Sequence, residues 1–153
     1  TFPTRGAMNH RAEALEAQGC TIVKTEEILW KHKDSWFYAY AATAEQIGVL
    51  KGYDDGRMGV GEPLTREDIA TLAYRTATQT GIKLSGESAE TFPDDSSIAN
   101  YAKDAVYAMK SAGIIKGMGD GTFSPKQYCT HAQAAKIIYE LIKLEGDKWW
   151  PEN

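Results

Sequence analysis

The stretch Gly113–Gly121, which reads GIIKGMGDG, repeats the stretch Gly48–Gly56, which reads GVLKGYDDG, at an offset of 65 residues. The same register continues without a gap to a second pair of matched positions, Thr65 and Thr130. Chance similarity would not preserve glycines, turns and helix caps in one register, so the chain holds two copies of one structural unit.

Each copy reads as a helix, a loop and a second helix. Apolar residues recur at helical spacing up to Gly48 in one copy and Gly113 in the other, and a glycine in the left-handed conformation is a common helix terminator. We expect serine side chains to cap these first helices, Ser35 in the first copy and Ser96 or Ser97 in the second.

The second helix of each copy has a strong start signal. Thr65 precedes Asp68, and Thr130 precedes Gln133, by three residues, and this spacing predicts a close variant of the capping box. Cys129 matches Leu64 in the repeat, which predicts that it fills an apolar slot. The stripes behind the two caps are predicted to face the core: Ile69, Leu72, Ala73, Ala134, Ile137, Ile138 and Leu141.

Composition excludes several classes of protein. The 153 residues are 42% hydrophobic and 25% charged, as in globular proteins, and the net charge of -4 without a basic block argues against a nucleic-acid partner. No apolar run is long enough to span a membrane, and no signal peptide is visible at Thr1, so we expect one to have been removed or to lie outside this sequence. The spacing of Cys20 and Cys129 does not support a disulfide.

No pattern in the sequence indicates catalysis or a cofactor. The three histidines show no metal-ligand spacing, and the acidic pairs lack the order of a calcium loop, so we expect no metal site. Phosphate-loop, dinucleotide and nucleophile-elbow motifs are absent, which makes an enzyme the least favoured class.

The two copies resemble the S-layer homology (SLH) domain. The resemblance rests on Phe92-Pro93-Asp94, on residues 112–117 (AGIIKG), on residues 120–125 (DGTFSP) and on Leu64-Thr65-Arg66-Glu67-Asp68. It implies a mainly α fold in which helix–loop–helix repeats pack as a pseudo-threefold helical bundle. It also implies a non-catalytic, secreted module that anchors bacterial surface proteins by binding a secondary cell-wall polysaccharide, an anionic and often pyruvylated glycan.

The resemblance suggests three segments. Residues 34–90 and 91–153 are the full repeats, and residues 1–33 are a partial or degenerate one. Two repeats leave one side of a threefold bundle open, and repeat proteins need neighbours to bury their faces. We therefore expect residues 1–33 to fill that side, with Thr4–Ala17 as an outer helix.

The resemblance also suggests a ligand site centred on arginine. A guanidinium binds a carboxylate with two charge-assisted bonds, and free N–H groups in the first turn of the helix at Arg66 would add to the attraction. We expect Arg66 with the Lys51–Gly56 loop to form the best-preserved groove, while His131 replaces the arginine in the second copy and weakens its groove. The candidate ligand-binding residues are Arg5, Trp36, Lys51, Gly52, Tyr53, Asp55, Gly56, Arg66, Lys116, Gly117, Asp120 and Gly121.

Other interpretations of these residues stay open. The Asp-Gly pairs are turn formers first, Arg66 is equally compatible with a solvated or carboxylate-paired side chain, and Trp36 and Tyr101 also fit core positions. The alternative function is a structural assembly module with degenerate grooves that contacts another protein or a second copy. The Trp149-Trp150 pair favours this alternative if it is exposed.

Overall fold

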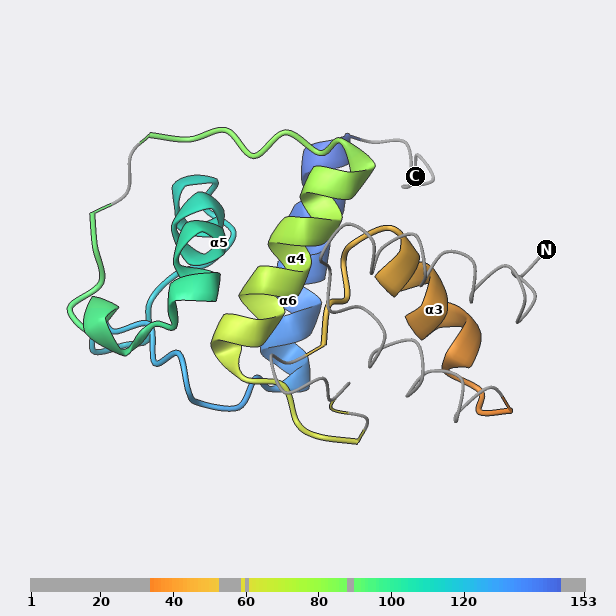
Figure 1. Cartoon of the computed structure of the whole chain (residues 1–153). Coiled ribbons are helices and arrows are strands. Elements are labelled where there is room, and N and C mark those ends of the chain that lie inside the picture. Colours follow the sequence, from red (N-terminus) through yellow and green to blue (C-terminus); the bar gives the residue numbers. More distant parts are fainter. Residues whose placement is uncertain (1–33, 53–58, 60, 88–89, 147–153) are drawn as a thin grey trace, which may run out of the picture. The chain divides into compact units, whose positions relative to one another are not determined.

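The computed structural model describes residues 34–52, 59, 61–87 and 90–146. This part of the chain is mainly helical, which confirms the predicted fold class, and within it no helix is long and apolar enough to cross a membrane. The elements, labelled in Figure 1, are α3 (Tyr38–Gln46), α4 (Arg66–Thr80), the short 3-10 helix η1 (Asp95–Ser97), α5 (Asn100–Ser111) and α6 (His131–Glu145).

Several expectations fall outside the described residues. Among them are the partial repeat at residues 1–33, its outer helix at Thr4–Ala17 and the Trp149-Trp150 pair. The threefold arrangement depends on the first of these segments, so it stays a prediction.

By its contacts the chain divides into two compact units, residues 1–62 and 63–153. In the first unit, α3 ends at Gln46, and Gly48 just beyond it adopts the predicted left-handed conformation with φ +80°. The predicted cap by the Ser35 side chain is wrong, because Phe37 is the N-cap residue and forms no side-chain cap. The backbone carbonyl of Ser35 accepts the N–H of Tyr38 at 3.1 Å instead, so a turn opens this helix.

In the second unit, α4 packs against both α5 and α6 (Figure 1). Small side chains on the α5-facing side of α4 let the two helices approach closely, and larger apolar residues fill the space around them. The core consists of Ala70, Ala73, Ala77, Phe92, Ile98, Ala102, Val106, Met109, Ile114, Ile115, Phe123, Ile137 and Leu141.

Local signals at the helix ends are confirmed. The Thr65 hydroxyl accepts the Asp68 N–H at 3.3 Å, and the Thr130 hydroxyl accepts the Gln133 N–H at 3.2 Å. In both helices the side chain three residues on also accepts the N–H of the threonine, which completes the capping box. Gly113, with φ +73°, follows the end of α5 as Gly48 follows the end of α3.

The predicted serine cap of α5 is wrong. Ser96 and Ser97 belong to η1, and Ala99 is the N-cap residue without a side-chain cap. The N–H of Ala99 donates instead to the Glu67 carboxylate at 2.9 Å. A buried acid from the neighbouring helix therefore takes over the role that a local serine was expected to play.

Four predicted side-chain environments differ from the structure. Ile138 was expected in the core but is 53% exposed, because Ile137 and Leu141 are the α6 residues buried in the core and Ile138 lies on another side of the helix. Cys129 is only partly buried. Trp36 and Tyr101 are exposed, so the core interpretation of both residues is wrong.

Candidate functional site

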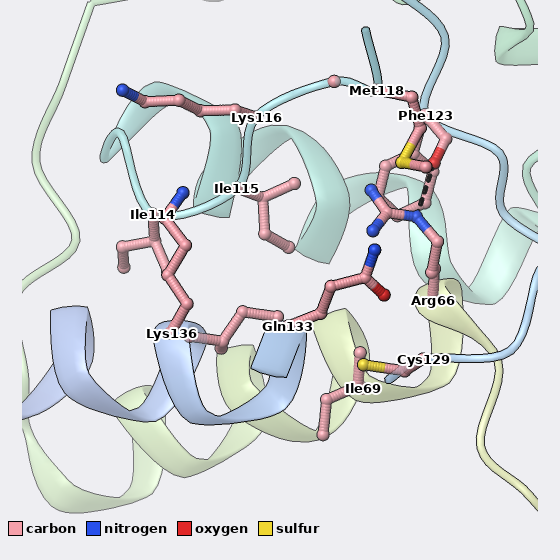
Figure 2. Close-up of a pocket in the computed structure, with 12 residues that line it drawn as sticks. Arg66, Ile69, Ile114, Ile115, Lys116, Met118, Phe123, Cys129, Gln133 and Lys136 are labelled. Carbon is pink, nitrogen blue, oxygen red and sulfur yellow. Dashed lines mark hydrogen bonds between the residues drawn. The ribbon is translucent and has the colours of Figure 1, made fainter. Parts of the chain in front are cut away.

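A pocket of about 150 Å³ lies in the second unit, between the start of α4, the α5–α6 loop and α6. Figure 2 shows Arg66 at one end of this pocket and Lys116 toward the other. None of the described lining residues is acidic, so the pocket is cationic with apolar walls. The lining residues are Arg66, Ile69, Ile114, Ile115, Lys116, Gly117, Met118, Phe123, Cys129, Gln133, Lys136 and Ile137.

Arg66 is the most constrained cation of the pocket. Its side chain is buried, with the residue only 8% exposed, and its Nε donates to the Phe123 carbonyl at 2.8 Å. Its guanidinium carbon lies 5.1 Å from the centre of the Phe123 ring, a cation–π contact. Burial lowers the pKa of Arg66 from its ordinary value, although the fields of Cys129 and Asp94 oppose that shift. The interpretation of Arg66 as solvated or carboxylate-paired is therefore wrong.

The terminal nitrogens of this guanidinium point into the pocket, toward the side where Ile115 and Gln133 lie (Figure 2). The hydrogen bond to Phe123 uses Nε alone, so it fixes the orientation of the fork while its outer edge faces the cavity. Such a fork recognises a planar anion in one orientation, as a free lysine does not.

The expected role of the α4 backbone in anion binding is wrong. The N–H of Arg66 donates to the Gln127 carbonyl at 2.8 Å, and the N–H of Glu67 donates to the Pro125 carbonyl at 3.1 Å. The third N–H of the turn is taken by the threonine cap. Loop carbonyls and the cap therefore satisfy the groups that normally make a helix N-terminus attractive to anions.

Asp94 fixes the α5–α6 loop, whose Phe123 carbonyl accepts the hydrogen bond from Arg66. Its two carboxylate oxygens accept the N–H groups of Phe123 and Ser124, each at 2.8 Å. The Phe123 ring also stacks on Phe92, with ring centres 5.4 Å apart. The backbone and the ring of Phe123, which binds Arg66, are thus fixed by Asp94 and Phe92. The position of Arg66 therefore depends on residues before and after α5.

The Asp120-Gly121 pair forms the predicted tight turn. The Asp120 carboxylate accepts the N–H of Thr122 at 2.9 Å and its hydroxyl at 2.8 Å, and these bonds lower the pKa of Asp120. Gly121 has φ +83°, and a Cβ at Gly117 would lie 3.0 Å from the Gly121 carbonyl oxygen. These contacts account for the glycines of the motif, and a ligand contact by Asp120 stays a prediction.

Of the predicted site residues, the structure brings Arg66, Lys116 and Gly117 together in one pocket. Trp36 and the segment 51–52 belong to the first unit. The pairing of Arg66 with the loop of its own repeat stays a prediction, because Tyr53, Asp55 and Gly56 lie outside the described residues, as does Arg5 of the partial repeat.

Sequence reasoning missed two polar residues of the pocket, Gln133 and Lys136 on α6. Both share a helix face with Ile137, which was correctly predicted to point inward, since the three residues follow i, i+3, i+4 spacing. Gln133 was assigned only its capping role, which it also fulfils by accepting the N–H of Thr130 at 3.1 Å.

Comparison with known proteins agrees with this architecture. The model of the S-layer homology domain family matches residues 30–70 and 91–135. An endoglucanase of Bacillus sp. is 32% identical over 114 residues, which are 74% of this chain and 12% of that protein. The middle cell wall protein of Brevibacillus brevis is 31% identical over 112 residues, 71% of this chain and 10% of that protein. The cellulosome-anchoring protein of Acetivibrio thermocellus is 28% identical over 134 residues, 86% of this chain and 30% of that protein.

The two matched segments cover more than half of the chain, which therefore belongs to the S-layer homology domain family. A domain of this family is a non-catalytic anchoring module associated with the cell surface or cell wall. The chain spans less than a third of each of these relatives, and the similarity to the endoglucanase is confined to a small part of that enzyme.

Proposed function

We propose that this chain anchors a secreted parent protein by binding a secondary cell-wall polysaccharide in the pocket headed by Arg66. The ligand group is an anion carried on a sugar, such as the carboxylate of a pyruvylated terminal residue. The observation that carries this proposal is a buried, oriented guanidinium in a pocket whose described lining holds two further cations and no acid.

The walls of the pocket support the same ligand chemistry. Lys116 and Lys136 add positive charge, while Ile114 and Ile115 offer apolar surface to the ring carbons or a methyl group of a sugar substituent. Gly117 brings backbone to the pocket without a side chain in the way. The names of the cell-wall and cellulosome-anchoring relatives also favour a wall-bound role.

Calorimetric titration of the full chain with purified wall polysaccharide fragments tests the proposal. Replacing Arg66 with alanine removes a charge-assisted contact worth roughly 1.5–3 kcal/mol, so affinity should fall about tenfold or more. His131→Ala is the matched control, since His131 occupies the same position of the other repeat, is exposed and does not line the pocket. It should change affinity little, and His131→Arg should leave affinity unchanged or raise it.

Arg66 is buried, so its alanine variant also requires a check of folding by circular dichroism. Lys136→Ala removes an exposed lysine at the edge of the same pocket and should reduce affinity several-fold without affecting the fold. Equal losses for Arg66→Ala and His131→Ala would contradict the ranking of the two sites. Unchanged affinity in a folded Arg66→Ala variant would refute the proposed site.

A further inference from the structure

The capping box of α6 fixes which end of the Gln133 amide faces the Arg66 pocket. Oε1 of Gln133 accepts the N–H of Thr130 at 3.1 Å. An amide oxygen accepts hydrogen bonds and an amide nitrogen donates them, so the cap turns Nε2 away from the helix end. Figure 2 shows this nitrogen directed toward the side of the pocket where the Arg66 guanidinium lies. The cap therefore presents a hydrogen-bond donor to the pocket.

Two groups of donors face this cavity. Nε of Arg66 and Oε1 of Gln133 are both engaged, but the outer nitrogens of Arg66 and Nε2 of Gln133 have no acceptor among the described residues. Arg66 is buried and Gln133 is half-buried, so the protein holds both in place. Donors cannot satisfy one another, and an acceptor that reaches both is therefore the ligand group that suits this pocket best.

The matching residue of the other repeat shows how a capping side chain serves two partners. Oδ2 of Asp68 accepts the N–H of Thr65 at 3.2 Å, and Oδ1 accepts the Tyr101 hydroxyl at 2.8 Å. One oxygen completes the cap and the other makes a tertiary contact. At the same repeat position, Gln133 offers a donor where Asp68 offers an acceptor. The exchange of acid for amide also keeps negative charge out of the pocket that holds Arg66.

We propose that Gln133 is a ligand-binding and specificity-determining residue, whose Nε2 donates to the same carboxylate that the Arg66 fork binds. An ionised carboxylate has about four acceptor sites, and a bidentate guanidinium leaves some of them for the amide. This inference rests on the function proposed above and narrows its ligand to a sugar that carries a carboxylate. A sugar whose carboxyl group is reduced to an alcohol has lost the charge and one oxygen, so the pocket discriminates against it.

Calorimetric titration of the full chain with purified wall polysaccharide fragments, native or carboxyl-reduced, tests the proposal. Gln133→Glu keeps an acceptor for the Thr130 N–H, so its melting temperature should not fall. It replaces the donor with a negative charge, so affinity for the native fragments should fall about tenfold or more. Gln79→Glu is the matched control, because it makes the same exchange at an exposed position of α4 that does not line the pocket. It should leave affinity unchanged.

A second pair of variants separates loss of the donor from added charge. Gln133→Met removes Nε2 without adding charge and should lower affinity for the native fragments several-fold. It also loses its half of the capping box, so Thr130→Ala, which loses the other half and keeps Nε2, is its control. Thr130→Ala should bind the native fragments as the wild type does. The reduced fragments should bind the wild type at least about tenfold more weakly than the native ones, and Gln133→Met should change that binding little.

The outcomes distinguish failure of this inference from failure of the proposed function. If Gln133→Met binds the native fragments as tightly as Thr130→Ala does, while Arg66→Ala still binds them weakly, Gln133 makes no ligand contact and this inference alone is overturned. If the wild type binds native and reduced fragments equally, or binds neither, the pocket does not recognise a carboxylate, and the proposed anionic ligand fails together with the role of Gln133.

Discussion

The first turns of α4 and α6 carry the same cap in different surroundings. Thr65 and Thr130 close the same capping box with the residue three positions on. Beyond the cap, the Arg66 and Glu67 side chains of α4 are buried against the next repeat, while the matching His131 and Ala132 of α6 are exposed. The helix start is therefore a local property of the repeat, and what it binds depends on the repeat that follows.

The side chains at these starts follow their surroundings. Glu67 accepts the N–H of Ala99, binds Lys126 and contacts the Tyr101 hydroxyl at 3.4 Å. Ala132, the counterpart of Glu67 on α6, is exposed, and an acid at this position would have no partner among the described residues. The comparison indicates that arginine and glutamate at the start of α4 serve the interface between repeats, whereas the threonines serve the helix itself.

The largest effect on this comparison is expected from Glu67→Ala. The change leaves the partly buried N–H of Ala99 without its acceptor and Lys126 without its partner, which should lower the free energy of unfolding by about 2–3 kcal/mol. Ala132→Glu, the matched change on the exposed start of α6, should stay within about 0.5 kcal/mol of wild type. Urea denaturation measures both free energies of unfolding. Equal losses would contradict the view that the start of α4 serves a contact between repeats and the start of α6 does not.

A smaller effect should separate the two caps. Thr65→Ala should cost about 1–2 kcal/mol, because the half-buried threonine both accepts from Asp68 and donates to its carboxylate at 2.6 Å. Thr130→Ala removes an exposed cap and should cost about 0.5 kcal/mol. The same denaturation assay compares them, and a larger loss at Thr130 would show that burial does not set the strength of the cap.

The smallest effect concerns pH and the α5 start, which has no side-chain cap. Lys103 and then the Tyr107 hydroxyl donate to Asp95 and hold its pKa below the ordinary value. A pKa depressed in the folded state stabilises above the unfolded pKa, and this stability is lost as pH falls through the folded pKa. Stability should therefore drop below about pH 4, and less steeply in Asp95→Asn. Thermal melting of wild type and Asp95→Asn across this pH range measures the effect. An identical dependence of the melting temperature on pH would assign the acid sensitivity to another group, for example Asp120.

Sequence reasoning found those features that depend on a few neighbouring residues. The helix-ending glycines Gly48 and Gly113 and the two threonine caps are specified by backbone conformation and by a side chain three positions away. Neighbouring residues in the sequence were therefore sufficient to predict these glycines and caps. The serine cap of α5 was wrong because a distant acid, Glu67, accepts the N–H of Ala99, and the serine cap of α3 was wrong because a backbone turn opens that helix.

Features that depend on tertiary contacts were missed or assigned differently. Phe92-Pro93-Asp94 served only to recognise the repeat, yet Phe92 is buried in the core and Asp94 fixes the loop whose Phe123 carbonyl binds Arg66. The inward stripe of α6 was extended to Ile138, because helical periodicity gives the width of an apolar stripe without telling which part a neighbour covers. The pocket joins Arg66 of one repeat to Lys116 of the next, a pairing that alignment of the repeats does not reveal.

The Arg66–Phe123 bond makes the pocket a property of folded tertiary structure, since it joins positions 57 residues apart in the chain. An unfolded chain cannot present this arrangement, so a ligand of the pocket binds the native state and shifts the unfolding equilibrium. At a ligand concentration of 100 times the dissociation constant the gain is about 2.7 kcal/mol. A module attached to a dense polymer would then be protected against unfolding and proteolysis for as long as it stays attached.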